Sequence, residues 1–318
     1  MKPPHQLILR AFSRIICANT PIPYAEPCII SAPAWSLLTT ITLSSLADPG
    51  KTFGLFRVWG TLGWMASSLL VSLWGLDFSA ETGKLGAGVR VFAGIACFLL
   101  PVTLPKGDKP KKWTDNLGLG ALKLLRDRDL FVYFSTALLF SIPLGAYYLH
   151  TPKHLKELGV ESVSAFMATA QVMETIAMLL MGWVIARFRV KTILLLAIGS
   201  GVLRYSFYAF DEVTWLVIGI TLHGFCWTFF FEAGRVFVHR RVDEGMRTQA
   251  QALLGFFTGG LGTVLGILTV DRLYHLLSPS WGWSGYWAVL TGMNCLALTL
   301  FAFGYKGRPI APKTKPLA

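Results

Sequence analysis

The sequence is poor in charged residues. Only 14% of its 318 residues are Asp, Glu, Lys or Arg, while 53% are hydrophobic and the mean hydropathy is +0.54. A soluble domain carries roughly 25% charged residues. This deficit excludes an ordinary cytosolic enzyme, a disordered tail and a nucleic-acid-binding module. The net charge of +12 does not indicate nucleic acid as a partner, because most basic residues lie between apolar runs.

Paired cysteines and catalytic motifs are also missing. The five cysteines show no paired spacing, and three lie inside apolar runs, which argues against a disulfide framework. Gly50-Lys51-Thr52 is not the end of a nucleotide-binding loop, because Ser45 stands where that loop needs a glycine. The sequence has no Gly-x-Ser-x-Gly pattern and no His/Cys group that completes a metal site. We therefore expect no enzyme, no metal and no other cofactor.

Long apolar runs are abundant. A bilayer-spanning helix needs about 20 mostly apolar residues, and eight runs meet or approach that length, with a ninth, shorter run interrupted by Pro33. The runs cover about residues 29–46, 54–76, 87–104, 129–150, 161–187, 190–210, 213–238, 249–276 and 283–304. The sequence thus predicts an all-α, polytopic membrane protein of about nine spans that contacts the lipid bilayer.

Lys and Arg are concentrated in alternate loops. The positive-inside rule places the richer set, which includes loop 105–128 and the tail 305–318, in the cytoplasm. Loop 105–128 separates an irregular segment 1–28 and a helical part 29–104 from a predicted six-helix bundle 129–304. A central basic loop between helical bundles is typical of transporters built from two halves.

Two groups of polar residues are candidates for a functional site. Arg57, Thr61 and Trp64 are spaced i, i+4, i+7, so a cation, a hydroxyl and an indole share one helix face. Alternatively, Arg57 reaches the cytoplasmic interface and Trp64 faces lipid. Gln171 and Glu174, at i, i+3, are neighbours deep in the span 161–187. A carboxylate at this depth costs ~2.5–3.5 kcal/mol on insertion scales.

Glu174 is therefore the best candidate for a proton carrier, the alternative being a structural hydrogen bond to a neighbouring helix. Arg204 is a possible counter-charge for Glu174 or Glu232, and the sequence does not choose between them. In the span 249–276, Gly255-x-x-x-Gly259 and Gly262-x-x-x-Gly266 predict close helix packing.

Over about residues 33–304 the sequence resembles the nucleoside:proton symporter family of the major facilitator superfamily. The motifs that carry this resemblance are Phe56-Arg57-Val58-Trp59-Gly60-Thr61-Leu62-Gly63-Trp64, Gln171-Val-Met-Glu174, Leu203-Arg204-Tyr205 and Leu222-His-Gly-Phe-Cys-Trp-Thr-Phe-Phe230. The resemblance implies a major-facilitator-type bundle of twelve helices, of which the first three are missing here. It also implies a central cavity and proton-coupled uptake of nucleosides by a multi-pass protein of the inner (plasma) membrane.

The resemblance also implies functional residues. The substrate-binding residues would be Arg57, Thr61, Trp64, Gln171, Trp227 and Thr228. Glu174 would be the proton-coupling residue. The expected partners are a nucleoside-like small molecule and protons, and the expected state is a monomer.

Two departures from the family pattern leave alternatives open. Thr228 stands where characterised members carry an aspartate, and residues 139–143 are apolar where members place amides. These departures favour transport of another small polar solute on the same fold. The short first half leaves a third alternative, a truncated remnant that does not transport.

Overall fold

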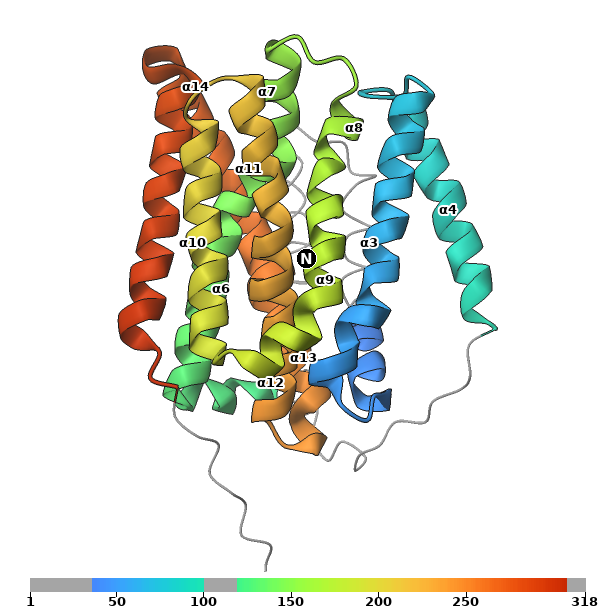
Figure 1. The fold of residues 1–318 in the computed structure, drawn as a ribbon, viewed down its shortest axis with the longest axis vertical. Helices are drawn as coiled ribbons and strands as arrows, with labels where there is room; N and C mark the ends of the chain where they lie inside the picture. Colours follow the sequence, from blue (N-terminus) through green and yellow to red (C-terminus); the bar gives the residue numbers. More distant parts are fainter. Residues whose placement is uncertain (1–35, 100–118, 308–318) are drawn as a thin grey trace, which may run out of the picture.

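The computed structural model describes residues 36–99 and 119–307, and within these residues the chain is helical with no β-strand (Figure 1). The predicted segment 1–28, the start of the span 29–46, and most of loop 105–128 and tail 305–318 lie outside the described residues. Residues 36–45 of the first predicted span are helical. The predicted all-α fold is confirmed.

Two helices, α3 (Pro49–Leu73) and α4 (Glu81–Cys97), correspond to the predicted spans 54–76 and 87–104. Asp48 begins α3 as its N-cap, because its side chain accepts a hydrogen bond from the backbone N–H of Gly50, and a proline follows in the first turn. Helix α3 runs along the bundle next to α9, whereas α4 lies on the outer side of α3 and slants away from the bundle (Figure 1).

The rest of the described chain is a helical bundle joined by short turns. Its elements are η2 (Leu119–Arg126), α6 (Arg128–Leu149), α7 (Thr151–Glu157), α8 (Val163–Met167), α9 (Thr169–Arg187), α10 (Val190–Tyr208), α11 (Val213–Cys226), η3 (Trp227–Glu232), α12 (Ala233–Arg241), η4 (Glu244–Met246), α13 (Arg247–Gly255), η5 (Phe256–Gly262) and α14 (Thr263–Gly304). The segments η3 and η5 are π-helical, a wider turn that is often found at functional sites.

Five continuous helical segments of the described chain are long and apolar enough to cross a membrane. They are Arg128–Glu157, Val163–Arg187, Val190–Tyr208, Val213–Arg241 and Glu244–Gly304. The last segment has 61 residues and contains two predicted spans, 249–276 and 283–304. Its backbone breaks at Gly282, where φ is +60° and ψ is −161°. Tyr274 and Tyr286, on either side of the break, both contact His150, so the chain turns back on itself there.

The predicted glycine motifs of this segment differ in their packing. A Cβ atom added at Gly262 or Gly266 would press on Ser141 and Ile142 of α6, whereas one added at Gly259 would have no neighbour within 4 Å among the described residues. The second motif therefore brings α14 close to α6, as predicted. The first motif makes no comparable contact at Gly259.

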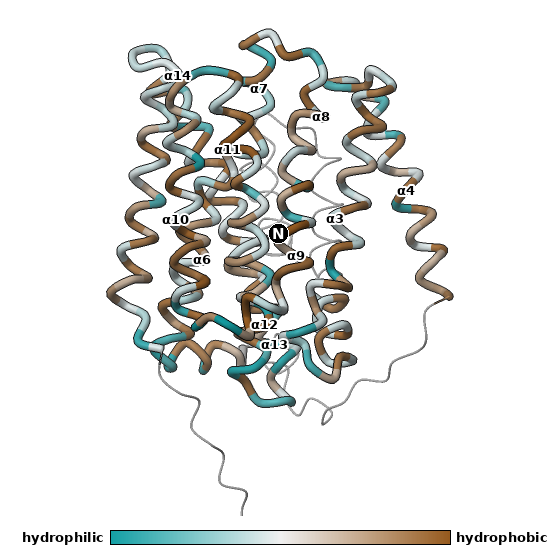
Figure 2. Tube along the Cα trace, in the orientation of Figure 1, coloured by the Kyte–Doolittle hydropathy of each residue, from teal (hydrophilic) through white to brown (hydrophobic). Residues whose placement is uncertain are grey.

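Hydrophilic residues gather at the end of the bundle near α12 and α13 (Figure 2), and two ion pairs join the elements that meet there. Arg240 of α12 pairs with Asp48 at 2.7 Å and so joins this end of the bundle to α3. Arg241 pairs with Asp127, the N-cap residue of α6, at 3.0 Å. These loops are the ones that the sequence assigns to the cytoplasm.

At the opposite end, α3 and the loop that follows it cap another helix. The backbone N–H of Ser164 donates to Asp77 at 2.7 Å, and that of Ala165 donates to the Ser72 hydroxyl at 2.9 Å. The Ser72 hydroxyl in turn donates to Asp77 at 2.8 Å. Ser162, the N-cap residue of α8 itself, makes no such bond through its side chain. The first turn of α8 is thus capped from α3 and its loop.

Between these two ends, α3 and α9 pack closely. A Cβ atom added at Gly54 of α3 would collide with the Met178 carbonyl of α9, and one added at Gly182 of α9 would collide with the Lys51 carbonyl of α3. Glycine at both positions lets the two backbones touch. This contact places the polar residues of α3 against α9.

Candidate functional site

The buried face of α3 carries a cation and a hydroxyl one turn apart. Thr61 belongs to the stripe that packs against α9 and is 2% exposed. Arg57 lies at the edge of this stripe, with a side chain that is 14% exposed. Residues four apart share a helix face, and the structure brings both residues to the contact between α3 and the bundle.

Glu174 of α9 meets this face of α3. The Thr61 hydroxyl donates a hydrogen bond of 2.6 Å to Glu174 Oε1, and the Glu174 residue is 5% exposed. A hydroxyl can donate to a carboxylate and accept from a carboxylic acid, so this contact can persist whether or not Glu174 carries a proton. On its other side, Gly224 of α11 lies against the backbone N of Glu174, where a Cβ atom would collide.

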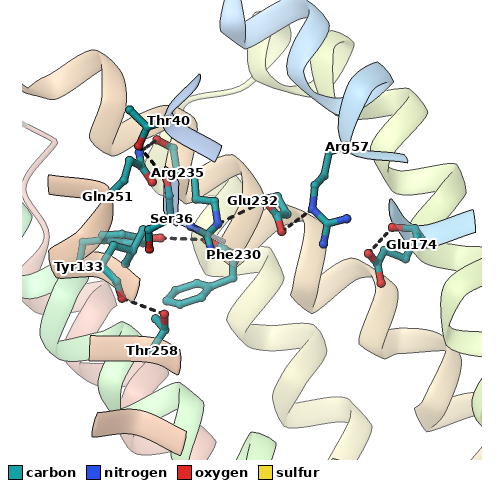
Figure 3. Close-up of polar contacts among 12 residues, drawn as sticks. Ser36, Thr40, Arg57, Tyr133, Glu174, Phe230, Glu232, Arg235, Gln251 and Thr258 are labelled. Carbon is teal, nitrogen blue, oxygen red and sulfur yellow. Dashed lines mark hydrogen bonds and ion pairs between the residues drawn. The ribbon is translucent and has the colours of Figure 1, made fainter. Parts of the chain in front are cut away.

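Arg57 makes an ion pair with a second buried acid. Its Nε lies 3.0 Å from Glu232 Oε1, and Glu232 Oε2 lies 3.4 Å from Nε of Arg235 (Figure 3). The side chain of Glu232 is 3% exposed. Two arginines and two glutamates, contributed by α3, α9, η3 and α12, therefore form one polar cluster inside the protein. We refer to Arg57, Glu174, Glu232 and Arg235 as the charged cluster.

Gln171 and Thr228 are buried with unused hydrogen-bonding capacity. Gln171 is 6% exposed and lies one turn before Glu174, and Thr228 is 0% exposed. Neither Gln171 Oε1 nor Thr228 Oγ1 has a hydrogen-bond partner within the described residues. Buried polar atoms are normally satisfied, so the Gln171 amide oxygen next to Glu174 stands out as an acceptor without a donor among the described residues.

The two predicted ring-stacking residues differ in exposure. Trp64 lies on the same edge of α3 as Arg57, and the residue is 55% exposed. Trp227 is half-buried, with its ring centroid 5.1 Å from Phe231 and 6.0 Å from His223. A flat aromatic side chain with an open face can stack a ring, and the open face is more evident at Trp64.

Arg204 neutralises neither acid, although the sequence allowed that pairing. It is 1% exposed; its Nη1 donates to His223 Nδ1 at 2.7 Å and its Nη2 to the Tyr205 hydroxyl at 2.7 Å. The reason is helix order, since α10 and α11 are neighbours in the bundle. Arg204 therefore links these two helices.

Sequence reasoning did not place Glu232 in the candidate site. An acid near the end of an apolar run is equally compatible with the membrane interface, and nothing in the spacing pairs it with a residue 175 positions earlier. Among the described residues, no group of three or more His, Cys, Asp or Glu side chains is placed to hold a metal ion. The cluster is suited to exchange protons and to bind hydroxyl and amide groups.

A family model described as nucleoside H+ symporter matches residues 27–309. The sequence is 30% identical to YegT of Escherichia coli K12 over 295 residues, which cover 86% of this chain and 69% of YegT. It is 24% identical to the nucleoside permease NupG of the same strain, in an alignment that covers 89% of this chain and 73% of NupG. It is 26% identical to the xanthosine permease of that strain, in an alignment that covers 86% of this chain and 71% of the permease.

Solved structures of the nucleoside transporter NupG share the fold. One, of a mutant, matches with a TM-score of 0.69 at 23% identity and covers 86% of this chain and 74% of that chain. Another matches with a TM-score of 0.62 at 24% identity, with 87% and 72% covered.

Proposed function

This chain belongs to the nucleoside H+ symporter family, and from that premise we propose that the charged cluster couples a nucleoside to a proton during transport. The family makes the chain a secondary active transporter and not an enzyme. It is a multi-pass protein of the inner membrane. The proposal concerns which residues carry out the coupling, and in what way.

One observation carries the proposal: the hydrogen bond between Thr61 and Glu174 crosses from α3 to α9. We assign α3 and α4 to one transporter half and the bundle from α6 to α14 to the other. Substrate and ion sites of such transporters lie between two halves that move against each other. A proton on Glu174 therefore turns a charge-assisted hydrogen bond between the moving parts into a neutral, weaker one.

The same region supplies groups suited to a nucleoside. Arg57 can donate to hydroxyl and base oxygens, and the Gln171 oxygen can accept from a base amine. While its proton is donated to Glu174, the Thr61 hydroxyl can only accept from the solute; it can donate to the solute once Glu174 is protonated. Trp64 and Trp227 offer rings for stacking a base, and Thr228 adds a hydroxyl one residue beyond Trp227. The names of NupG and of the xanthosine permease point to the same solute class.

The coupling follows from charge. With Glu174 ionised, a negative charge lies at the α3–α9 contact close to Arg57, and separating the two helices would break its charge-assisted hydrogen bond from Thr61 and move it away from the Arg57 guanidinium. A proton from outside removes that charge, so the helices can rearrange with the solute bound. Release of the proton inside restores the first state. We propose that the chain does this as a monomer.

Uptake of radiolabelled uridine into proteoliposomes tests this function. We expect an inward proton gradient to drive uptake in the unaltered chain, and Glu174→Gln to abolish that dependence, because glutamine cannot exchange a proton. Glu212→Gln is the matched control, since Glu212 is exposed and caps no helix through its side chain. Gradient-driven uptake that survives in Glu174→Gln would remove Glu174 from the mechanism.

A second candidate function keeps the fold and changes the solute. It is favoured by Thr228, which brings a neutral hydroxyl where characterised members carry an aspartate, and by the apolar stretch 139–143 of α6. Ligand-induced thermal shifts across nucleosides, sugars and drug-like compounds would separate the two. A thermal shift with sugars alone would favour the second solute class. If the chain neither binds nor transports any of these solutes, the non-transporting remnant would be favoured instead.

A further inference from the structure

We infer that Glu232 is a positioning residue of the transport reaction: it holds the Arg57 guanidinium away from Glu174 and so sets the pH range over which transport is driven. This inference rests on the proposed function and concerns a residue that the family motifs do not include. The contact that carries it is the 3.0 Å ion pair between Arg57 and Glu232 (Figure 3).

The setting of Glu232 makes its charge consequential. The residue is 2% exposed and lies in the apolar interior next to Phe230 and Phe231. A buried carboxylate is tolerated only when it is paired. Both of its oxygens face an arginine, since Arg57 reaches Oε1 from α3 and Arg235 reaches Oε2 from α12.

The two arginines have different roles in this arrangement. Arg235 is three residues after Glu232, on the same helical rod, and therefore moves together with it. Arg57 is on α3, which we assign to the other transporter half. The Arg57–Glu232 pair thus spans the moving contact, as the Thr61–Glu174 bond does one turn further along α3.

Charge balance links the two acids. With Glu174 and Glu232 both ionised, the two glutamates balance the two arginines; a proton on Glu174 leaves one excess positive charge. Other polar groups near the cluster come from α3, α6, α9 and α13, and among the described residues they do not add a further carboxylic acid. They are Thr61, Tyr133, Tyr147, Tyr148, Gln171 and Gln251. Arg57 therefore has two carboxylates to choose between, and Glu232 is the one it contacts in this structure.

Removing the charge at Glu232 leaves Arg57 with Glu174 as its remaining carboxylate in the cluster. An opposite charge nearby favours the ionised form of an acid, so protonating Glu174 then requires a higher proton concentration. Transport would start only at more acid pH. A residue that merely packed the helices together would change the amount of active protein without moving this pH range.

The experiment measures uridine uptake by proteoliposomes as a function of external pH. In Glu232→Gln we expect the pH of half-maximal uptake to fall by about one unit. In Glu232→Asp, which keeps the charge but shortens the side chain, we expect a smaller shift in the same direction. Glu212→Gln, the exposed control, should leave the midpoint unchanged.

Three outcomes would overturn the inference. They are an unchanged midpoint in both Glu232 variants, a shift to higher pH, and a uniform loss of rate at every pH, which would mean a structural role only. If Glu232→Gln does not yield folded protein, the midpoint of Glu232→Asp decides. If uptake by the unaltered chain does not depend on the proton gradient, that result would instead contradict the proposed function.

Discussion

In the described part of the chain, the Thr61 hydroxyl is the hydrogen-bond donor to the Glu174 carboxylate, so its removal should have a measurable effect. Thr61→Val keeps the shape of the side chain and leaves a buried carboxyl oxygen without a donor, which costs about 1–3 kcal/mol. We expect a lower melting temperature in detergent. Thr299→Val is the control, because Thr299 is exposed and bonds only to a carbonyl of its own helix. An equal change in both variants would contradict the assigned contact.

At the scale of single residues, the sequence predicts those parts of the candidate site that depend on the helix period or on the depth of a residue in an apolar run. The spacing of Arg57 and Thr61 places them on one face, and the burial cost of Glu174 marks it as the candidate proton carrier, a role that stays a prediction. Glu232 could not be found this way, because its partner lies on another helix. For the same reason the sequence left the partner of Arg204 open, and only the adjacency of α10 and α11 resolves it.

At the scale of elements, the α3–α9 contact depends on two glycines. Alanine at Gly54 or Gly182 would place a Cβ atom on a carbonyl of the facing helix. Overpacking of this kind costs typically about 1–3 kcal/mol. We expect both variants to lose stability in thermal unfolding. Gly63→Ala is the matched control on α3, since no atom lies within 4 Å of its added Cβ among the described residues; equal stability of all three variants would contradict this packing.

The cap on α8 gives a further prediction. Partial desolvation opposes ionisation of Asp77, but the hydrogen bonds from Ser164 and Ser72 outweigh it and hold the pKa of Asp77 below its ordinary value of 3.8. A lowered pKa means stability that is present above the ordinary value and is lost as pH falls through the lowered one. The carboxylate therefore caps α8 throughout the neutral range.

Asp77→Ala should lower stability by about 0.5–2 kcal/mol, and Asp77→Asn, which can still accept a hydrogen bond, should lower it less. Between about pH 5 and 8 the difference between Asp77→Ala and the unaltered chain should stay constant. Melting temperatures measured across this range check both statements. A difference that grows or disappears within the range would show that Asp77 titrates there.

Element boundaries and types were predictable to different degrees. Apolar runs located the spans from 129 to 304 to within a few residues, because membrane thickness fixes their length. The π-helical turns η3 and η5 were not predicted. A change from i+4 to i+5 bonding over one turn does not alter the apolar pattern of a run that is hydrophobic all round.

For the whole molecule, alternating access requires the end of the bundle at α8 to open. Ser72 and Ala165 meet there at 2.9 Å across the two proposed halves. In a background without other cysteines, Ser72→Cys combined with Ala165→Cys should let a short bis-methanethiosulfonate linker join α3 to α8 through two disulfide bonds. We expect the linked protein to lose uptake and to recover it when the link is reduced. Full uptake in the linked state would show that this end does not need to open.

Glycine at position 224 has a consequence for how α9 and α11 move during transport. Since α11 touches α9 directly behind Glu174, we expect the two helices to move together there, with Glu174 in the larger of the two proposed halves. Thr61 and Arg57 belong to the smaller proposed half. In each transport cycle we therefore expect Glu174 to exchange its neighbours on α3 while its contact with α11 stays unchanged.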